Sequence, residues 1–161
     1  MPVVEAQANK ARAIARAQMT RSGHVYIISN IGSFGEQVFK IGMTRRLDPM
    51  DRVRELGDAS VPFHFDVHSI IFSEDAPGLE AALHRMFNDR RINRVNERKE
   101  FFRITIDEIA EAVRQHHGEI EIICEAEAVD YRKTLAIIHD VQSSTSDQIE
   151  GSVKAITASV S

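Results

Sequence analysis

The sequence predicts an α/β fold of the α+β kind, in which a three-stranded antiparallel sheet is flanked by helices. Two observations lead to this prediction. Residues 25–28 and 37–43 are rich in β-branched and aromatic side chains, and the glycines and serine between them favour a hairpin turn. Three later segments repeat apolar residues at the three- and four-residue spacing of helices that cover a sheet.

The chain divides into three predicted parts. Residues 1–21 are rich in alanine with scattered lysine and arginine, which favours a helical extension. Residues 22–117 form the globular domain, where a third strand over residues 63–72 follows the hairpin. Residues 118–161 begin as an acidic helical extension. From residue 143 they become a Ser/Thr-rich tail that we expect to be mobile or a packing appendage.

The helices of the domain have recognisable starts. Asp48 is an N-cap before Pro49 at the first helical position, and Gly57 ends that helix. Ser73 or Asp75 caps the next helix. An extended segment at residues 100–104 precedes a third helix over residues 107–117. The predicted core-facing side chains are Met50, Val53 and Leu56 in the first helix, Leu79, Ala82, Leu83, Met86 and Phe87 in the second, and Ile109, Ala110 and Val113 in the third.

Composition indicates a cytoplasmic protein. Hydrophobic residues make up 43% of the 161 residues, which is enough to fill a core. No apolar run reaches the roughly 18 residues of a membrane span, and the N-terminus lacks the apolar region of a signal peptide. Cys124 is the single cysteine, which excludes an internal disulfide and a multi-cysteine zinc site.

The net charge of −4 conceals an uneven distribution. Residues 1–103 hold 16 Lys and Arg against 13 Asp and Glu, whereas residues 104–161 hold 4 against 11. A basic region between residues 84 and 103 favours a polyanion such as nucleic acid, because each cation at a phosphate releases counterions. A solvated basic surface is the alternative. The predicted nucleic-acid contacts are Arg45, Arg46, Arg90, Arg91, Arg94 and Lys99.

Five motifs follow one another along the domain. They are GHVYI at 23–27, FKIGMT at 39–44, DPMDRVREL at 48–56, EAALH at 80–84 and EFF at 100–102. In this order they resemble the T5orf172 branch of the GIY-YIG nuclease superfamily, which occurs in phage and bacterial proteins, often behind a coiled-coil region. The resemblance covers residues 22–117.

The resemblance implies a metal-dependent endonuclease that hydrolyses DNA phosphodiester bonds with Mg²⁺ or Mn²⁺. DNA is expected as the partner in preference to RNA. By motif position, Tyr26 would help to activate the attacking water, Arg52 would bind the scissile phosphate and Glu80 would hold the metal. Lys40 and His84 complete the expected catalytic set.

The residue types are consistent with these roles. Tyr26 needs a nearby cation to lose its proton near neutral pH, since its ordinary pKa is about 10. Lys40 on the neighbouring strand could supply that cation or contact phosphate. Glu80 and His84 are four residues apart and share a helical face, so His84 could move a proton or contact phosphate. Glu100 is expected to support the site by orienting His84, Arg52 or a metal-bound water.

Each of these residues also has an ordinary structural interpretation. Tyr26 could be a half-buried sheet residue and Lys40 a solvent-facing one, and Arg52 or the Glu80–His84 pair could make surface contacts. The sequence also departs from better-known members, because Lys40 stands where they carry a second tyrosine. Their late asparagine has no clear equivalent, although Asn93 and Asn96 are near.

Two other readings stay open. The domain could be a non-catalytic nucleic-acid-binding module with the same fold. It could also be an assembly module, forming a homo-oligomer through its terminal helices. A transition-metal site built from His64, His68, His116 and His117 is a weaker hypothesis, because nothing fixes the geometry of these residues.

Overall fold

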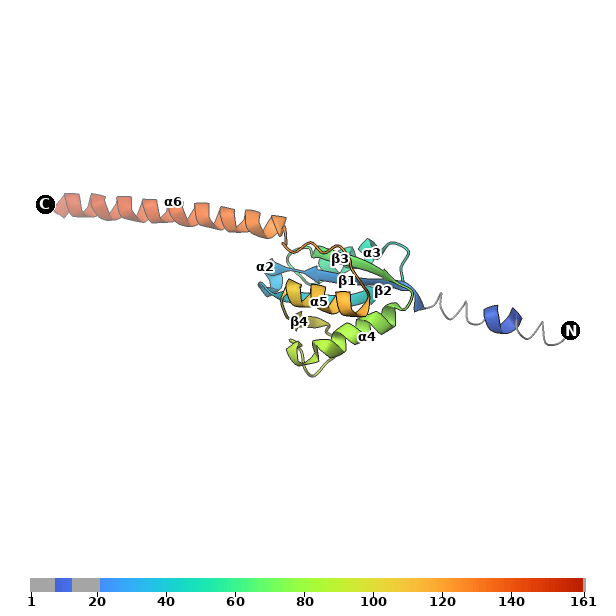
Figure 1. Ribbon diagram of the computed structural model, residues 1–161. Helices are drawn as coiled ribbons and strands as arrows, with labels where there is room; N and C mark the ends of the chain where they lie inside the picture. Colours follow the sequence, from blue (N-terminus) through green and yellow to red (C-terminus); the bar gives the residue numbers. More distant parts are fainter. Residues whose placement is uncertain (1–7, 13–20, 161) are drawn as a thin grey trace. The chain divides into compact units, whose positions relative to one another are not determined.

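The computed structural model describes residues 8–12 and 21–160, which form two compact units, Met1–Glu127 and Ala128–Ser161 (Figure 1). The first unit holds the sheet, and the second is one long helix. Residues 8–12 are helical, as predicted for the N-terminal extension, and the rest of that prediction up to residue 20 lies outside the described residues.

A four-stranded antiparallel sheet forms the centre of the first unit. Its strands are β1 (Gly23–Ser29), β2 (Val38–Thr44), β3 (Asp66–Ser73) and β4 (Phe101–Arg103), in the order β3-β1-β2-β4. The predicted three-stranded sheet therefore lacked one strand. The missing strand is β4, which has three residues and pairs with residues 38–40 of β2. Such a short, distant pairing has no local sequence signal.

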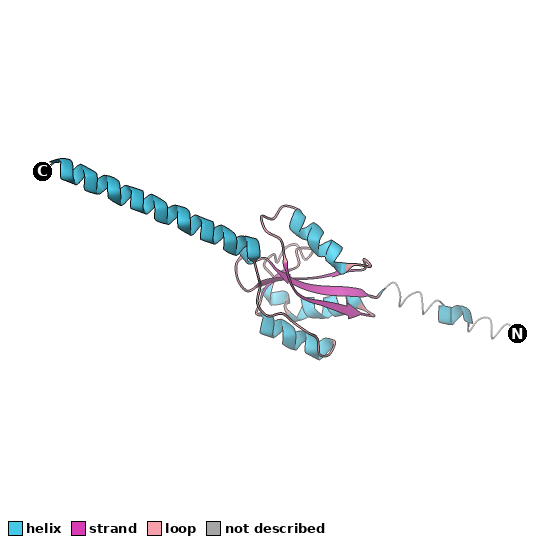
Figure 2. Ribbon diagram, turned by 90° about the horizontal axis from the view of Figure 1, so that it is seen from above, coloured by secondary structure: helices cyan, strands magenta, loops and turns pink. Residues whose placement is uncertain are grey.

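Helices cover both faces of the sheet (Figure 2). On one face, α3 (Pro49–Asp58) packs Val53 against Tyr26 and Ile28 of β1. The other face carries the main core, where α4 (Ala76–Met86) and α5 (Ile106–His116) pack against β1 and β2. Because side chains alternate along a strand, neighbouring residues of β1 and β2 serve opposite cores.

Helix starts are set by side-chain caps, as predicted. The Asp48 side chain accepts a hydrogen bond from the Met50 amide, with Pro49 in the first turn of α3. Asp75, rather than Ser73, is the N-cap of α4, and it accepts from the Gly78 amide. These caps orient α3 and α4, which carry the predicted site residues of the two faces.

Several local predictions were wrong. The turn after β1 contains a short helix, α2 (Ile31–Phe34), capped by Asn30. The helix α3 ends at Asp58, one residue beyond the predicted end at Gly57, and Gly57 is buried, with an added Cβ only 3.2 Å from Nδ1 of His64. Met86 is 44% exposed and lies outside the core. β3 begins at Asp66, three residues later than the predicted strand.

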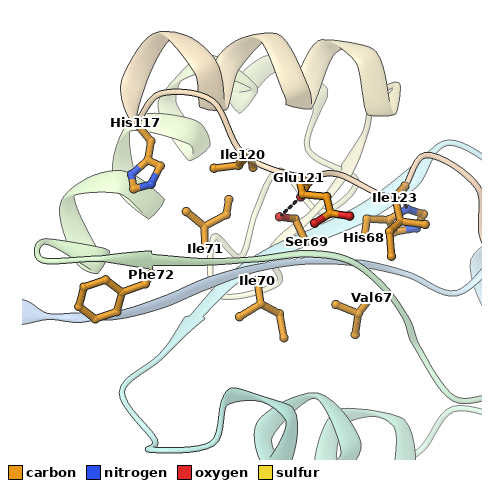
Figure 3. Close-up of a pocket in the computed structure, with 10 residues that line it drawn as sticks. All are labelled: Val67, His68, Ser69, Ile70, Ile71, Phe72, His117, Ile120, Glu121 and Ile123. Atoms are coloured by element: carbon orange, nitrogen blue, oxygen red, sulfur yellow. Dashed lines mark hydrogen bonds between the residues drawn. The ribbon is translucent and has the colours of Figure 1, made fainter.

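Residues 119–127 form an extended strap instead of the predicted acidic helix. The Ser69 hydroxyl donates to the Glu121 carbonyl at 2.9 Å, and the Ile123 amide donates to the His68 carbonyl at 2.8 Å. Figure 3 shows the strap above β3, bordering a pocket of about 550 Å³. These side-chain and backbone bonds explain why the segment is extended although its composition suits a helix.

The second unit is α6 (Val129–Val160). The backbone stays helical through the Ser/Thr-rich segment from residue 143, so the helix extends beyond the predicted boundary at Gln142. None of the helices within residues 8–12 and 21–160 is long and apolar enough to cross a membrane.

A three-residue 3₁₀ turn, η1 (Asn88–Arg90), follows α4 in the first unit.

Candidate active site

The predicted site residues meet where the edge of β2 is left open. β4 pairs only with residues 38–40, so β2 has no strand partner on this edge from Ile41 onward. Instead, the Ile41 amide donates to the Glu100 carbonyl at 3.2 Å, and the Ile41 carbonyl is 2.7 Å from Nε2 of His84. One strand residue thus fixes both α4 and the segment that leads into β4.

Glu80, His84 and Glu100 form a cluster of possible metal ligands beside this edge. Each offers one ligand atom, and these atoms all lie within 4.8 Å of one another. Glu80 and His84 are one turn apart on α4, while Glu100 comes from the other side of the opening. All three are half-buried, so the cluster is shielded yet reachable. Two carboxylates and an imidazole form a donor set that suits a divalent cation such as Mn²⁺.

His84 is held in the form that a metal ligand requires. A carbonyl can only accept, so Nε2 donates its hydrogen to Ile41 and the neutral ring keeps its lone pair on Nδ1. Burial lowers the pKa of His84, which favours this neutral form. Metal-binding histidines commonly donate their second ring nitrogen to a backbone carbonyl in this way.

Glu80 is close to an unfavourable charge. Burial and then the neighbouring Glu100 raise the pKa of Glu80 to about 7, while Lys40 and Arg91 oppose the rise. Two carboxylates this close repel one another unless a cation or a proton lies between them. A positive charge near Glu80 and Glu100 is therefore favourable at neutral pH.

Lys40 supplies part of that charge. Its ammonium lies 3.2 Å from Oε2 of Glu100, and its side chain is only 9% exposed. It also lies over the Phe101 ring, 5.3 Å from the centroid. Lys40 is thus fixed inside the site, unlike the solvent-facing lysine of the alternative interpretation.

Tyr26 is packed against a glycine on β2. It pairs with Gly42 in the register of β1 and β2, and a Cβ added at Gly42 would lie 2.4 Å from the tyrosine hydroxyl oxygen. Lys40 lies two residues away on the same face of β2, diagonal to Tyr26. The glycine therefore makes the space that lets the phenol lie flat across the strand.

The protonation of Tyr26 depends on three neighbours. Burial, then Glu100 and more weakly Glu80, raise the pKa of Tyr26 to about 12, although Arg52 hydrogen-bonds to it and lowers the value. With both carboxylates charged, the phenol keeps its proton at neutral pH. Neutralising the carboxylates would remove their contribution and lower the pKa, while burial, the largest cause, would still raise it.

Comparison with protein families decides the classification of this domain. The T5orf172 domain family matches residues 23–117, which is more than half of the chain. The chain belongs to the T5orf172 family. This family is related to the GIY-YIG nucleases. The chain has no significant match among curated proteins or solved structures.

The T5orf172 domain thus brings together Tyr26, Lys40 and Arg52 on the α3 face and Glu80, His84 and Glu100 at the open edge. Arg52 hydrogen-bonds to Tyr26, and its guanidinium also lies 3.6 Å from Glu55 in a surface ion pair.

Five of the six predicted nucleic-acid contacts fall into two groups. Arg45 and Lys99 are exposed, as is Arg94, which donates to the Asp89 carbonyl. Arg46 pairs with Glu55, and Arg90 pairs with Glu108. Those two arginines would have to exchange a carboxylate for a phosphate on binding.

Arg91 has a different position, which sequence reasoning missed. It is 8% exposed, lies over the Phe102 ring at 4.9 Å, and donates to the Asn88 side chain and the Glu97 carbonyl. Its charge also lowers the pKa of Glu80 and His84. Arg91 is therefore buried close enough to Glu80 and His84 for its charge to act on both. Its isolated pairing with Phe102 leaves no periodic signal in the sequence.

The remaining candidates are separate from the site. Asn93 caps its own loop by accepting from the Val95 and Asn96 amides. His68 is buried against Ser29, whereas His64 is exposed beside Asp58. Within the described part of the chain, Glu80, His84 and Glu100 are the one metal-ligand cluster, so the four-histidine site does not form.

Proposed function

We propose that this T5orf172 domain hydrolyses DNA phosphodiester bonds with the help of Mg²⁺ or Mn²⁺. The cluster of Glu80, His84 and Glu100 carries the proposal, because its three ligand atoms lie within 4.8 Å of one another. Family membership makes nuclease chemistry the first candidate, and DNA the first substrate. Mn²⁺ suits the imidazole better, whereas Mg²⁺ prefers the carboxylates and water.

Each protein group has a distinct task in this proposal. A divalent cation held by Glu80, His84 and Glu100 would stabilise negative charge on the phosphate and on the leaving oxygen. Arg52 would grip two phosphate oxygens from the α3 side. The Tyr26 hydroxyl oxygen would accept a hydrogen bond from the attacking water and orient it, and Lys40 would hold Glu100 in place through their ion pair.

Plasmid cleavage tests this function. Wild-type protein with Mg²⁺ or Mn²⁺ should cut supercoiled DNA, and Glu80→Ala should reduce the rate by about 100-fold or more. Ala81→Ser, on the exposed side of the same helix, is a matched control that should cut normally. Cleavage that survives Glu80→Ala would refute the metal assignment.

A binding module is the second candidate, favoured by one observation. Burial, and then Glu100 and Glu80, raise the pKa of Tyr26 to about 12, so the phenol keeps its proton at neutral pH and is a poor base. If the wild type binds DNA but never cuts DNA or RNA with either metal, the non-catalytic function is the correct one.

A further inference from the structure

Three phenylalanine rings from separate segments of the first unit meet beside the sheet. Phe34 belongs to α2, Phe65 to the segment that leads into β3, and Phe101 to β4. The Phe34 and Phe101 ring centroids are 4.8 Å apart. The centroid of Phe65 lies 6.2 Å from that of Phe34 and 6.4 Å from that of Phe101. We define the aromatic cluster as these three residues.

One ring of the aromatic cluster is open to solvent on a fixed support. Phe65 has a packing role, because it contacts the core formed by Tyr26, Ile28 and Val53, whereas Phe34 is 39% exposed. The buried Asn30 side chain holds α2 by accepting from the Ser33 amide and by donating to the Phe63 carbonyl at 2.6 Å. The support of Phe34 is thereby tied to the segment that carries Phe65.

The aromatic cluster adjoins the proposed catalytic residues. α2 joins β1 to β2 at the end of β2 where β4 pairs (Figure 1). Phe101 pairs with Lys40 in the register of β4 and β2, and paired residues of antiparallel strands lie on the same face. The Lys40 ammonium lies 5.3 Å from the Phe101 centroid and 3.2 Å from Oε2 of Glu100. Glu100, a proposed metal ligand, directly precedes Phe101 in the chain.

We propose that the aromatic cluster stacks on a base of single-stranded DNA while a phosphate of the same strand lies at Glu80, His84 and Glu100. The inference rests on the proposed function and names the form of DNA that the site prefers. Aromatic side chains beside positive charge are the means by which proteins bind single strands, since the rings stack on bases and the cations contact the backbone. Here the exposed Phe34 ring supplies the stacking surface.

Stacking on a side chain favours a single strand over a duplex. Both faces of a base in a duplex are covered by its neighbours, so a protein ring reaches such a base only after it has been unstacked. Every base has an aromatic face, so the contact selects the single strand without selecting a sequence. Lys40 and the exposed Lys99 place positive charge next to Glu100 and Phe101. Glu36, two residues after Phe34, instead lines a pocket with Asp107 and Thr105.

The absence of tryptophan from the sequence allows a direct test. Phe34→Trp places a single fluorescent ring in the aromatic cluster. Phe72→Trp is the matched control, because Phe72 is 56% exposed at the far end of β3, against His24. Each full-length variant would be titrated, with a chelator present, with a single strand of about 12 nucleotides and with the corresponding duplex. We expect the single strand to quench Phe34→Trp at a concentration at least about fivefold below that of the duplex, and to leave Phe72→Trp unchanged.

Phe34→Leu gives a second measurement, because leucine keeps an apolar contact with Phe65 and Phe101 but removes the ring. The dissociation constant of the labelled single strand, measured by fluorescence anisotropy, should rise by at least about fivefold, while that of the duplex stays the same. Equal quenching by both forms of DNA, equal quenching of the two tryptophans, or an unchanged affinity in Phe34→Leu would overturn the proposal.

The stacking and the nuclease activity can fail separately. Plasmid cleavage by a protein whose Phe34→Trp variant shows no quenching would refute the stacking and leave the proposed function standing. Quenching by the single strand in a protein that never cuts DNA would support the stacking and refute the nuclease activity.

Discussion

Replacing Glu80 with glutamine should make the metal-free protein more stable at pH 8. Burial and Glu100 raise the pKa of Glu80 from 4.5 to about 7, so the folded state holds this proton more tightly than the unfolded state. The wild type therefore loses stability as the pH rises from 4.5 to 7 and loses no more above 7. Glutamine mimics the protonated side chain and removes this loss.

The size of the effect follows from the two pKa values. Their difference corresponds to at most about 3.4 kcal/mol. Solvent on the open side of the site screens the charge, so about 1–2 kcal/mol is expected at pH 8. At pH 4 the variant and the wild type should be equally stable, because Glu80 is then protonated in both states.

Urea unfolding in the presence of a chelator, monitored by circular dichroism, measures the free energy of unfolding of wild type and Glu80→Gln at pH 4 and at pH 8. Saturating Mn²⁺ should make the wild type more stable than Glu80→Gln at pH 8, because only the wild type keeps the full ligand set. Binding at a hundred times the dissociation constant adds about 2.7 kcal/mol to the wild type. A wild type that is more stable than Glu80→Gln in chelator at pH 8 would refute the reasoning, since Glu80 would then be ionised and well paired.

Two further predictions concern β2. Gly42→Ala places a methyl group within 2.4 Å of the Tyr26 hydroxyl oxygen, so it should destabilise the fold by about 1–3 kcal/mol and reduce cleavage by at least tenfold. Cleavage at the wild-type rate, measured on plasmid DNA, would show that the position of Tyr26 does not matter. Lys40→Met removes the cation that competes for Glu100, so Mn²⁺ should bind about tenfold more tightly at pH 8.5 in calorimetry while cleavage falls. Weaker Mn²⁺ binding would show that Lys40 assists the ligands.

Local rules predicted much of the fold. The β-branched strings became β1 and β2, and the Asp48-Pro49 start of α3 formed as expected, because capping and strand propensity act over a few residues. Residues 100–104 were expected to be extended, but the pairing of β4 with β2 was not predicted, because no local signal links two segments this far apart in the sequence. The helical structure of the Ser/Thr-rich end of α6 was also not predicted, because the prediction relied on the composition of this segment and not on the spacing of its few apolar residues.

The site was predictable only in part. Four-residue spacing indicated that Glu80 and His84 share a face of α4, and the structure has them on that face. The bond from His84 to the Ile41 carbonyl and the ion pair between Lys40 and Glu100 join residues 43 and 60 positions apart. No sequence period links such pairs, because they depend on how α4 and β4 approach β2. A glycine within a strand was the available signal for Gly42.

Titration of the wild type with Mn²⁺ tests the central claim most directly. Calorimetry at pH 8 should show one site per chain, and the affinity should fall about tenfold at pH 6, where protons compete for Glu80. Glu80→Ala should abolish the binding. A wild type without Mn²⁺ binding at pH 8, or binding that is unchanged in Glu80→Ala, would contradict the account.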